Sequence, residues 1–392
     1  VAAATRCWPG NPKVPHLFGR KLSQDYRFAE GATLQREALK LEPAYLPAKA
    51  QLAQDLLRLG EDDEGWRLAQ EVHDKDGYDV TALNLVTLRD TMARYATVTN
   101  AHFVVHLTPK ESALYGARVL ELLETARTRL SARYGFAPER PVRVEMFADQ
   151  KDFAVRTFGM PENHGFLGVC FGPVITANSP ASRPGQAFNW EAMLWHEFCH
   201  VITLQLTRNK MPRWLSEGIS VYEERQASPA WGERIGARYR EMILGDDLTP
   251  VGRLSRAFMS PPSAVHLQFA YYQCSLVVEF IVERFGFEKL VAILRDLGEG
   301  TAINDALARA TVPLPQLEKD FTAFARQKAL ALGPTLGWEK PDAPADGKPS
   351  ANVDWASWSR AHPTNFYVLS RQAAEMTEEK RWTDARAVLE RL

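Results

Sequence analysis

The segment 190–206, which reads WEAMLWHEFCHVITLQL, constrains the fold more than any other part of the sequence. Apart from His196, Glu197 and His200, its interior is apolar on nearly every side, a pattern typical of a helix buried on all faces. Burying two imidazoles and a carboxylate costs several kcal/mol unless these groups are paired or bind a metal. The segment therefore predicts a buried central helix that carries a polar centre.

The spacing of these three residues predicts a metal site. His196 and His200 are four residues apart, so both side chains project from one face of the helix on successive turns. Two imidazoles spaced in this way can reach one zinc ion, and Glu197 then lies beside the metal's open position. Sixteen residues separate His200 from Glu217. A second buried helix carrying Glu217 would complete a His, His, Glu set for one zinc ion per chain, and the adjacent Gly218 fits a close approach of that helix to the first.

Some alternatives stay open for this cluster. The side chains could form a buried polar cluster without metal. Glu224, seven residues after Glu217 and on the same helix face, could replace it as a ligand. Glu223 lies on another face and is expected to be solvated. Cys199 is turned about 100° from His200 around the helix, and we expect it to be a core thiol.

The remaining pattern predicts an α+β fold that is mostly helical. Segments 102–107, 142–147 and 168–176 are rich in β-branched and aromatic residues and predict short strands. Segment 114–134 has helical spacing, and 190–332 is helical again. We expect a small mixed sheet beside a helix bundle built around segment 190–206.

Both ends of the chain carry a repeated helical pattern. Shifting 12–45 by 34 residues superposes it on 46–79, with Gly19 on Ala53 and Gly31 on Gly65. This pattern of small residues resembles the tetratricopeptide repeat. The same template returns in 366–392, where the predicted buried positions are Leu369, Ala373, Met376, Trp382, Ala385 and Leu389.

These patterns suggest domain limits. We expect helical repeats at 1–94, a domain containing the metal site at 95–332, a linker rich in Pro, Gly, Ala and Asp at 333–354, and further repeats at 355–392. The last repeat stops at Leu392 without its closing turn, so we expect the natural protein to continue. The repeats could only pack against the central domain, or they could present a concave groove to a protein partner.

The motifs resemble a known family. The stretch WHEFCHVITLQLTRNKMPRWLSEGISVYEE (195–224) resembles the gluzincin zinc metallopeptidases, and most the peptidase-MA-like branch, in which a W-L-x-E-G helix follows the HExxH helix after a short loop with a Pro before the Trp. The resemblance spans roughly residues 100–330. The stretch FAYYQCSLVVEFIVERFGFEKLVAILRDLGEG (269–300) is similar to the family's A-Y-x-Q helix and the G-x-E-K-L helix that follows it.

The resemblance implies roles for individual residues. In this family the two histidines and the Glu of the E-G pair hold zinc, which maps onto His196, His200 and Glu217. The general base maps onto Glu197. Tyr271, or else Tyr272, is implied to donate a hydrogen bond to the developing oxyanion; His266 is an electrostatic alternative.

An edge strand in such enzymes pairs with the extended backbone of a peptide or protein substrate. It corresponds here to Gly168, Val169, Cys170, Phe171 and Gly172. The aminopeptidase branch carries an acidic residue on that strand, whereas Gly168–Gly172 contains none. We therefore expect an endopeptidase-like enzyme. The thermolysin-like branch has an Asp four residues after the third ligand, where this chain has Val221.

The composition of the chain argues against several classes of protein. The chain has 47 Lys and Arg against 48 Asp and Glu, interleaved along its length, which argues against nucleic acid as a partner. No run approaches the roughly 18 apolar residues of a membrane-spanning helix, so we expect no transmembrane segment. Four scattered cysteines do not make a disulfide framework. The start lacks a Met, and the compartment stays open, with a lean towards the bacterial periplasm or secretion if a signal peptide was removed.

A competing interpretation is a scaffold whose metallopeptidase-like domain binds zinc or peptide without turnover. Glu197 separates the two interpretations, because a scaffold has no need of a general base beside an open zinc position.

Overall fold

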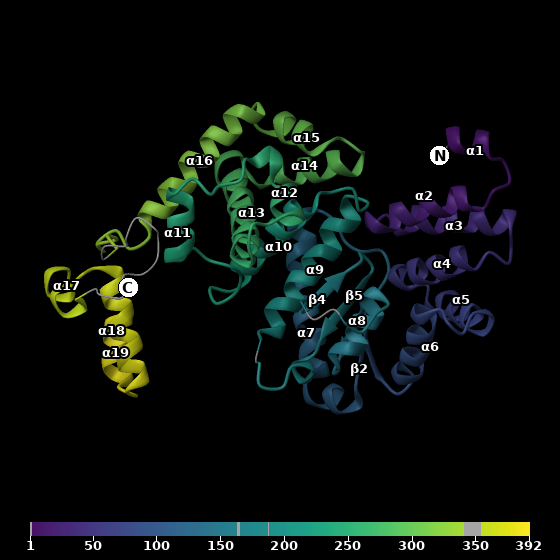
Figure 1. Cartoon of the computed structure of the whole chain (residues 1–392), viewed down its shortest axis with the longest axis horizontal. Coiled ribbons are helices and arrows are strands. Elements are labelled where there is room, and N and C mark those ends of the chain that lie inside the picture. Colours follow the sequence, from purple (N-terminus) through teal and green to yellow (C-terminus); the bar gives the residue numbers. More distant parts are fainter. Residues whose placement is uncertain (1, 163–164, 187, 341–353) are drawn as a thin grey trace. The chain divides into compact units, whose positions relative to one another are not determined.

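The computed structural model describes residues 2–162, 165–186, 188–340 and 354–392. It divides into two compact units (Figure 1): the first is Val1–Arg234 with Thr249–Phe321, and the second is Ile235–Leu248 with Thr322–Leu392. The domain limits given above stay a prediction, and the expected linker at 333–354 lies mostly outside the described residues.

Helices form the N-terminal part of the first unit. Their bounds are α1 Ala2–Cys7, α2 Lys13–Gln24, α3 Phe28–Leu41, α4 Leu46–Leu59, α5 Asp62–Lys75 and α6 Val80–Met92. Helices α3 and α5 begin and end 34 residues apart, which is the predicted period. A Cβ atom added at Gly19 would lie 2.9 Å from the carbonyl oxygen of Gly31, and one at Gly65 would lie 3.2 Å from that of Ala53. Small residues thus let the paired helices touch; the assignment to tetratricopeptide repeats stays a prediction.

A five-stranded mixed sheet follows. Its strands are β1 Ala96–Thr99, β2 Phe103–Leu107, β3 Val142–Phe147, β4 Gly168–Cys170 and β5 Val174–Asn178. Their order is β1-β2-β3-β5-β4. Strands β2, β3 and β5 run parallel, and β1 and β4 are antiparallel edge strands. With the surrounding helices, this sheet confirms the predicted mostly helical α+β fold.

The prediction of one strand at 168–176 is wrong. The chain reverses after β4, and the N–H of Phe171 donates to the carbonyl of Val174 over 2.8 Å. Gly172 has φ +109°, which glycine adopts readily, and Pro173 lacks the N–H that a continuous strand needs. The segment is therefore a hairpin of β4 and β5.

Helices cover both faces of the sheet. Helix α8 (Gln150–Phe158) and the N-terminal helices share one hydrophobic core with the sheet, which includes Phe28, Leu57, Phe147 and Phe171. Helices α7 (Pro109–Tyr134) and α9 (Trp190–Leu206) contact each other and the sheet as well. Side chains alternate along a strand, and in β4 Val169 joins the core with the N-terminal helices while Gly168 lies against α9. Strand β4 therefore lies between these two helical layers.

The other elements of the described residues are helices. The remaining elements of the first unit are η1 Pro180–Ser182, α10 Arg213–Ala227, η2 Val251–Arg253, α12 Ser255–Met259, α13 Ala264–Phe285, α14 Phe287–Gly298, α15 Ile303–Ala310 and the start of α16 Leu314–Ala331. The second unit contains the rest of α16 together with α11 Ala237–Leu244, α17 Trp355–Ala361, α18 Phe366–Glu378 and α19 Trp382–Leu389.

The C-terminal hairpin of α18 and α19 follows the repeat template only in part. Leu369, Ala373 and Ala385 are buried as predicted. Trp382 and Leu389 are 63% and 54% exposed, so the prediction that they are buried is wrong. A hairpin of two helices buries only the facing stripe of each helix, and both residues lie outside that stripe.

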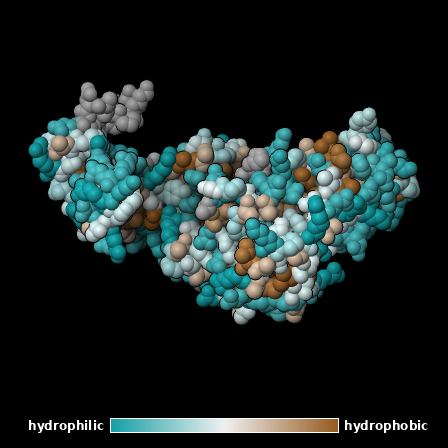
Figure 2. Space-filling model, turned by 90° about the horizontal axis from the view of Figure 1, so that it is seen from below, coloured by the Kyte–Doolittle hydropathy of each residue, from teal (hydrophilic) through white to brown (hydrophobic). Residues whose placement is uncertain are grey.

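One helix in the described part of the chain is long and apolar enough to cross a membrane. It is α13, and 61% of its apolar window is buried inside the fold. The core helix of a soluble protein meets the same criteria, so this is weak evidence for a span. On the face seen in Figure 2, hydrophilic residues surround small groups of hydrophobic ones.

Candidate metal centre

Helix α9 carries the two histidines, as predicted. The side chain of Asn189 caps its first turn by accepting from the N–H of Ala192 over 3.0 Å, and the helix is buried along most of its length. The rings of His196 and His200 lie 4.7 Å apart on one face. The local sequence therefore determines their mutual position.

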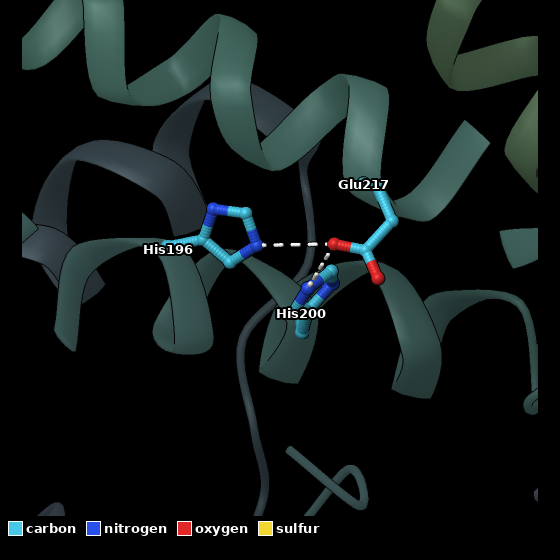
Figure 3. Close-up of side chains that lie close together, drawn as sticks. All are labelled: His196, His200 and Glu217. Carbon is cyan, nitrogen blue, oxygen red and sulfur yellow. Dashed lines mark hydrogen bonds and ion pairs between the residues drawn. The ribbon is translucent and has the colours of Figure 1, made fainter. Parts of the chain in front are cut away.

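Helix α10 brings the third side chain to them (Figure 3). One carboxylate oxygen of Glu217, Oε2, lies 3.3 Å from Nε2 of His196 and 3.6 Å from Nε2 of His200. Donor atoms from the three side chains all lie within 4.8 Å of one another. Tetrahedral ligands at zinc-bond distances of about 2.0–2.1 Å are separated by about 3.3 Å. The two distances from Glu217 are close to this separation, and the group of three side chains could hold a metal ion.

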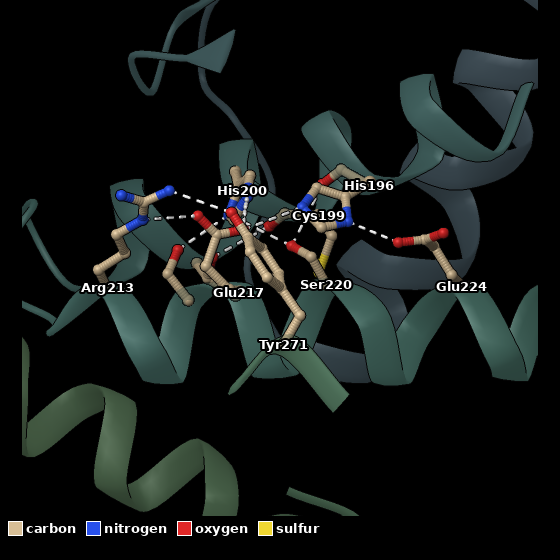
Figure 4. Close-up of polar contacts among 10 residues, drawn as sticks. His196, Cys199, His200, Arg213, Glu217, Ser220, Glu224 and Tyr271 are labelled. Atoms are coloured by element: carbon tan, nitrogen blue, oxygen red, sulfur yellow. Dashed lines mark hydrogen bonds and ion pairs between the residues drawn. The ribbon is translucent and has the colours of Figure 1, made fainter. Parts of the chain in front are cut away.

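The Nδ1 atom of each imidazole is within hydrogen-bond distance of another side chain (Figure 4). Nδ1 of His196 lies 2.5 Å from Oε1 of Glu224. Nδ1 of His200 lies 2.8 Å from the hydroxyl of Ser216 and 3.2 Å from that of Ser220. Such partners orient an imidazole and leave Nε2 free for a metal. Glu224 therefore contacts the side of His196 that faces away from Glu217, which does not favour Glu224 as an alternative ligand.

Two residues near the ligands differ from expectation. Glu223 is only 2% exposed and accepts from the hydroxyl of Tyr134 over 2.8 Å, so the prediction that it is solvated is wrong. Gly218 lies against α13, because a Cβ there would be 2.7 Å from the carbonyl oxygen of Cys274. Its predicted approach to α9 is therefore also wrong. Cys199 is fully buried, as expected of a core thiol.

Glu197 is buried beside the ligands and 6% exposed. Among the described residues its Oε2 atom has no hydrogen-bond partner. Burial raises the pKa of its carboxyl, while the charges of His200 and His196 act in the opposite direction. A buried polar atom without a partner is costly, and this one is available to accept a proton from a bound molecule.

Arg213 and Tyr271 flank the centre on the side of Glu217 (Figure 4). The guanidinium of Arg213 donates to Oε1 of Glu217 over 3.2 Å and to the hydroxyl of Tyr271 over 3.0 Å. Burial raises the pKa of Tyr271 to about 12, so its hydroxyl stays a donor at neutral pH. Tyr272 is 2% exposed, and His266 bonds to Ser263 at the start of α13. Of the three candidates, the observed contacts connect Tyr271 to the ligands.

The electrostatics of the centre favour a cation. Burial opposes ionisation of Glu217, but the hydrogen bonds and charges of His196 and His200 hold its pKa well below the usual range. Desolvation opposes protonation of His196, yet its hydrogen bonds to Glu217 and Glu224 raise its pKa well above the usual range. Without a metal, the surrounding carboxylates thus draw a proton onto the imidazole. A divalent cation could supply the same positive charge.

Part of the predicted substrate strand lies beside Glu197. A Cβ at Gly168 would be 2.8 Å from Oε1 of Glu197, and Val169 and Cys170 complete strand β4. Phe171 and Gly172 lie in the turn beyond it, where the carbonyl of Gly172 accepts from the side chain of Gln205. Only the β4 end of the predicted segment therefore reaches the centre.

Sequence reasoning missed the residues that support the ligands. Arg213 lies one helical turn before Glu217, and Ser216 and Ser220 flank it on the same helix. The four-residue spacing of Arg213 and Glu217 could have predicted their contact, because residues four apart share a helix face. No comparable signal connects Glu224 with His196, which lie on different helices.

A comparison with known protein families identifies the central part of the chain. The model of the Peptidase MA superfamily matches residues 124–326, just over half of the 392 residues, and the match contains α9, α10 and α13. No curated protein matches the chain. The family match supports a peptidase-like enzyme that acts on peptides or proteins. The chain belongs to the Peptidase MA superfamily.

Proposed function

We propose that this protein is a zinc-dependent peptidase of the gluzincin type, with one zinc ion per chain held by His196, His200 and Glu217. One observation carries the proposal. Two imidazole Nε2 atoms and one carboxylate oxygen converge beside a buried carboxylate, that of Glu197, which has an unpartnered oxygen. A purely structural cluster would have no use for this unpartnered oxygen of Glu197, because buried polar atoms in proteins are normally hydrogen-bonded.

The donor set fits zinc. Imidazole nitrogen and carboxylate oxygen are among its usual ligands, and three protein ligands leave a fourth position for water. A zinc ion there would act as a Lewis acid and lower the pKa of a bound water towards about 7. With Nε2 used for the metal, Nδ1–H of His196 donates to Glu224 and Nδ1–H of His200 donates to the hydroxyls of Ser216 and Ser220. These bonds hold both imidazoles in the orientation that ligation needs.

Glu197 is the proposed general base. It accepts a proton from the attacking water and passes it to the leaving amine. Burial raises the pKa of its carboxyl, which brings that pKa closer to neutral pH and strengthens the group as both base and acid. Gly168 leaves room for this chemistry, because a side chain there would collide with Glu197.

Tyr271 is the proposed oxyanion donor. Its hydroxyl would donate a hydrogen bond to the carbonyl oxygen as negative charge develops on it. Arg213 bonds to that hydroxyl and to Glu217, so it positions the two groups relative to each other.

Strand β4 is the proposed substrate strand, with Gly168, Val169 and Cys170 in contact with the peptide. The carbonyl of Leu167 and the N–H of Phe171 bond to the β5 side. Main-chain bonding alternates along an antiparallel strand, so the N–H and C=O groups of Gly168 and Cys170 face the free edge. An extended peptide can add to such an edge. Because an acidic anchor for a free amine is lacking in 168–172, we propose endopeptidase-like cleavage.

The flanking helices are proposed to be tetratricopeptide-like repeats that could present a surface to a protein partner. The 34-residue offset between α3 and α5 supports this assignment.

The decisive experiment combines metal analysis with peptide cleavage. Purified wild-type protein should contain about one zinc per chain and cleave peptides in a chelator-sensitive reaction. Glu197→Gln should keep the metal and lose roughly 10³-fold in kcat/KM, because loss of a general base costs about 10²–10⁴-fold. Glu191→Gln is the matched control: it lies in the first turn of α9, pairs with Arg118, and should leave cleavage unchanged.

Other outcomes would contradict the proposal. Protein without zinc, or equal cleavage by wild type and Glu197→Gln, would exclude the zinc-water mechanism. Zinc or peptide binding without any turnover would instead identify a scaffold.

A further inference from the structure

The turn between α2 and α3 contains a tyrosine in an unusual backbone conformation. Tyr26 has φ 63°, in the left-handed region. The same turn recurs in two other helical hairpins, where this position is Gly60 with φ 77° and Lys380 with φ 60°. In all three turns the next N–H bonds to a carbonyl five residues earlier, as in Arg27 to Leu22, which is the motif that ends many helices. These three hairpins therefore carry tyrosine, glycine and lysine at one position of the same turn, and the turns at Gly135, Arg208, Asp246 and Gly300 make the same bond.

Glycine is the residue that suits this position. It adopts positive φ without strain, whereas a side chain with a Cβ atom is disfavoured there. Gly60 follows this rule in the hairpin of α4 and α5, 34 residues after Tyr26. A large side chain kept in a strained conformation is a reason to look for a function.

The surroundings of Tyr26 place it near the proposed substrate strand. Its carbonyl accepts from the side chain of Asn209 over 2.7 Å, in the loop that follows α9. Its ring centroid lies 6.1 Å from that of Phe171, at the end of β4, and 5.3 Å from that of Phe28. Asn209 and Arg208 also have positive φ. Two segments with positive φ, the turn at Tyr26 and the loop at Arg208 and Asn209, thus contact each other beside the end of β4.

The charges of the metal centre also act on Tyr26. The residue is 39% exposed, yet its hydroxyl is surrounded closely enough for burial to raise the pKa of Tyr26 to about 12. After Arg58, the charges that act on this hydroxyl are those of Glu217, Arg213 and Glu197. The hydroxyl is therefore a protonated donor on the side of the molecule where these three residues lie.

A peptide paired with the free edge of β4 would run from Glu197 towards Tyr26. Gly168 lies against Glu197, and Phe171 lies three residues further along the chain. Strands advance about 3.3 Å per residue, so the backbone of Phe171, with Tyr26 next to its ring, lies roughly 10 Å along the strand from Gly168. Strand β4 forms one side of this path and α9 another, and the turn between α2 and α3 lies beside Phe171 and the loop that follows α9.

We propose that Tyr26 is a specificity-determining residue, through which the N-terminal hairpin forms one wall of the substrate site and contacts the bound peptide about three residues from the scissile bond. Its ring takes an apolar or aromatic side chain of the peptide, and its hydroxyl donates to the peptide backbone. This inference rests on the proposed peptidase function. It predicts that the enzyme requires an extended peptide with an apolar residue on that side.

Kinetics on peptides of graded length test the role. Fluorogenic peptides are shortened one residue at a time from either end and assayed with wild type, Tyr26→Gly, Tyr26→Phe and Lys380→Gly. Tyr26→Gly should fold, because glycine is favoured in this turn. It should raise KM about tenfold, equivalent to about 1.4 kcal/mol, for long peptides and leave kcat within about twofold.

The length dependence gives the sharper result. The difference between wild type and Tyr26→Gly should disappear once peptides are too short, from one end only, to reach Tyr26. Tyr26→Phe should have a smaller effect on KM, because it keeps the ring and loses only the hydroxyl. Lys380→Gly, which changes the equivalent position of the C-terminal hairpin, is the matched control and should behave as wild type.

The outcomes separate this inference from the function on which it rests. Absence of zinc-dependent cleavage by wild type overturns the proposed function, and the role of Tyr26 with it. Normal wild-type cleavage with an unchanged KM in Tyr26→Gly for every peptide overturns the role of Tyr26 alone. A uniform fall in kcat for all peptide lengths also overturns it, because that pattern indicates a merely structural residue.

Discussion

Two regions of the first unit bury charged side chains in opposite ways. Between the N-terminal helices and the sheet, Nε of Arg156 lies 2.7 Å from Oε2 of Glu145, and both side chains are at most 1% exposed. Arg156 also donates to the carbonyl of Leu57 over 2.9 Å. In the metal centre, His196, His200 and Glu217 instead bring three metal-binding atoms within 4.8 Å of one another. The first region compensates its charge within the chain, and the second leaves capacity for a ligand.

The pKa of Glu217 differs in direction from those of other buried carboxylates. Burial raises the pKa of Glu145 despite the nearby charge of Arg156, and burial raises the pKa of Asp55 to about 6. In the metal centre the pKa of Glu217 lies well below its usual range because two imidazoles bond to it. Burial alone therefore does not mark a functional carboxylate. What distinguishes Glu217 is that its surroundings keep it ionised while its partners are themselves metal-binding groups.

Breaking the pair in the first region should have the largest effect on stability. Arg156→Met leaves Glu145 buried without a counter-charge, and such a loss costs about 3–5 kcal/mol. The free energy of unfolding in urea measures it. Arg118→Met, at the largely exposed pair with Glu191, should cost at most about 1 kcal/mol. The double variant Arg156→Met with Glu145→Leu removes both charges and should recover much of the lost stability. If the double variant were as unstable as Arg156→Met, the unpaired charge of Glu145 would not be the cause of the instability.

Asp55 should make the stability of the N-terminal hairpins depend on pH. Its folded-state pKa is raised to about 6 from 3.8, so the folded protein keeps a proton that the unfolded chain releases. Stability should therefore fall as pH rises from about 4 to about 6, by roughly 3 kcal/mol from this group alone. Asp55→Asn should remove that slope. Asp63, which is exposed, provides the control: Asp63→Asn should leave the pH dependence of stability unchanged. If Asp55→Asn kept the same pH dependence as wild type, Asp55 would not be its source.

Glu224 should influence metal affinity with a smaller effect. Its carboxylate contacts Nδ1 of His196, and removing such a partner lowers metal affinity about 10–100-fold, or about 1.4–2.7 kcal/mol. Zinc competition against a chromogenic chelator measures the effect of Glu224→Gln. The neighbouring Glu223 bonds to Tyr134 and pairs with Arg133 instead, so Glu223→Gln should leave zinc affinity unchanged. Equal affinities for wild type and Glu224→Gln would assign Glu224 to packing alone.

Features encoded within a single helix were predictable. The four-residue spacing of His196 and His200 decides that they share a face, whatever surrounds the helix. The 34-residue period likewise matched the helix bounds, because small residues at fixed spacing determine where two adjacent helices touch. Glu217 was predictable through its resemblance to a family motif, and the structure brings it to the two histidines.

Features that depend on contacts between distant segments were not predictable. The composition of 168–176 indicated one strand, whereas the pairing of β4 with β5 made it a hairpin. Glu223 and Glu224 are neighbours in sequence, yet one bonds to Tyr134 in α7 and the other to His196 in α9. Nothing near Tyr26 in the sequence connects it with Glu197.

The sequence by itself determined the chemistry of the centre: two imidazoles and a carboxylate at helical spacing, because periodicity controls which side chains share a face, and a second carboxylate in a motif that resembles a known family. Only the tertiary structure decided which groups support the ligands, which strands lie at the edges of the sheet, and that an N-terminal tyrosine lies beside Phe171 after the end of β4. These depend on how helices and strands far apart in the chain pack together, and packing is set by the shape and volume of many side chains at once.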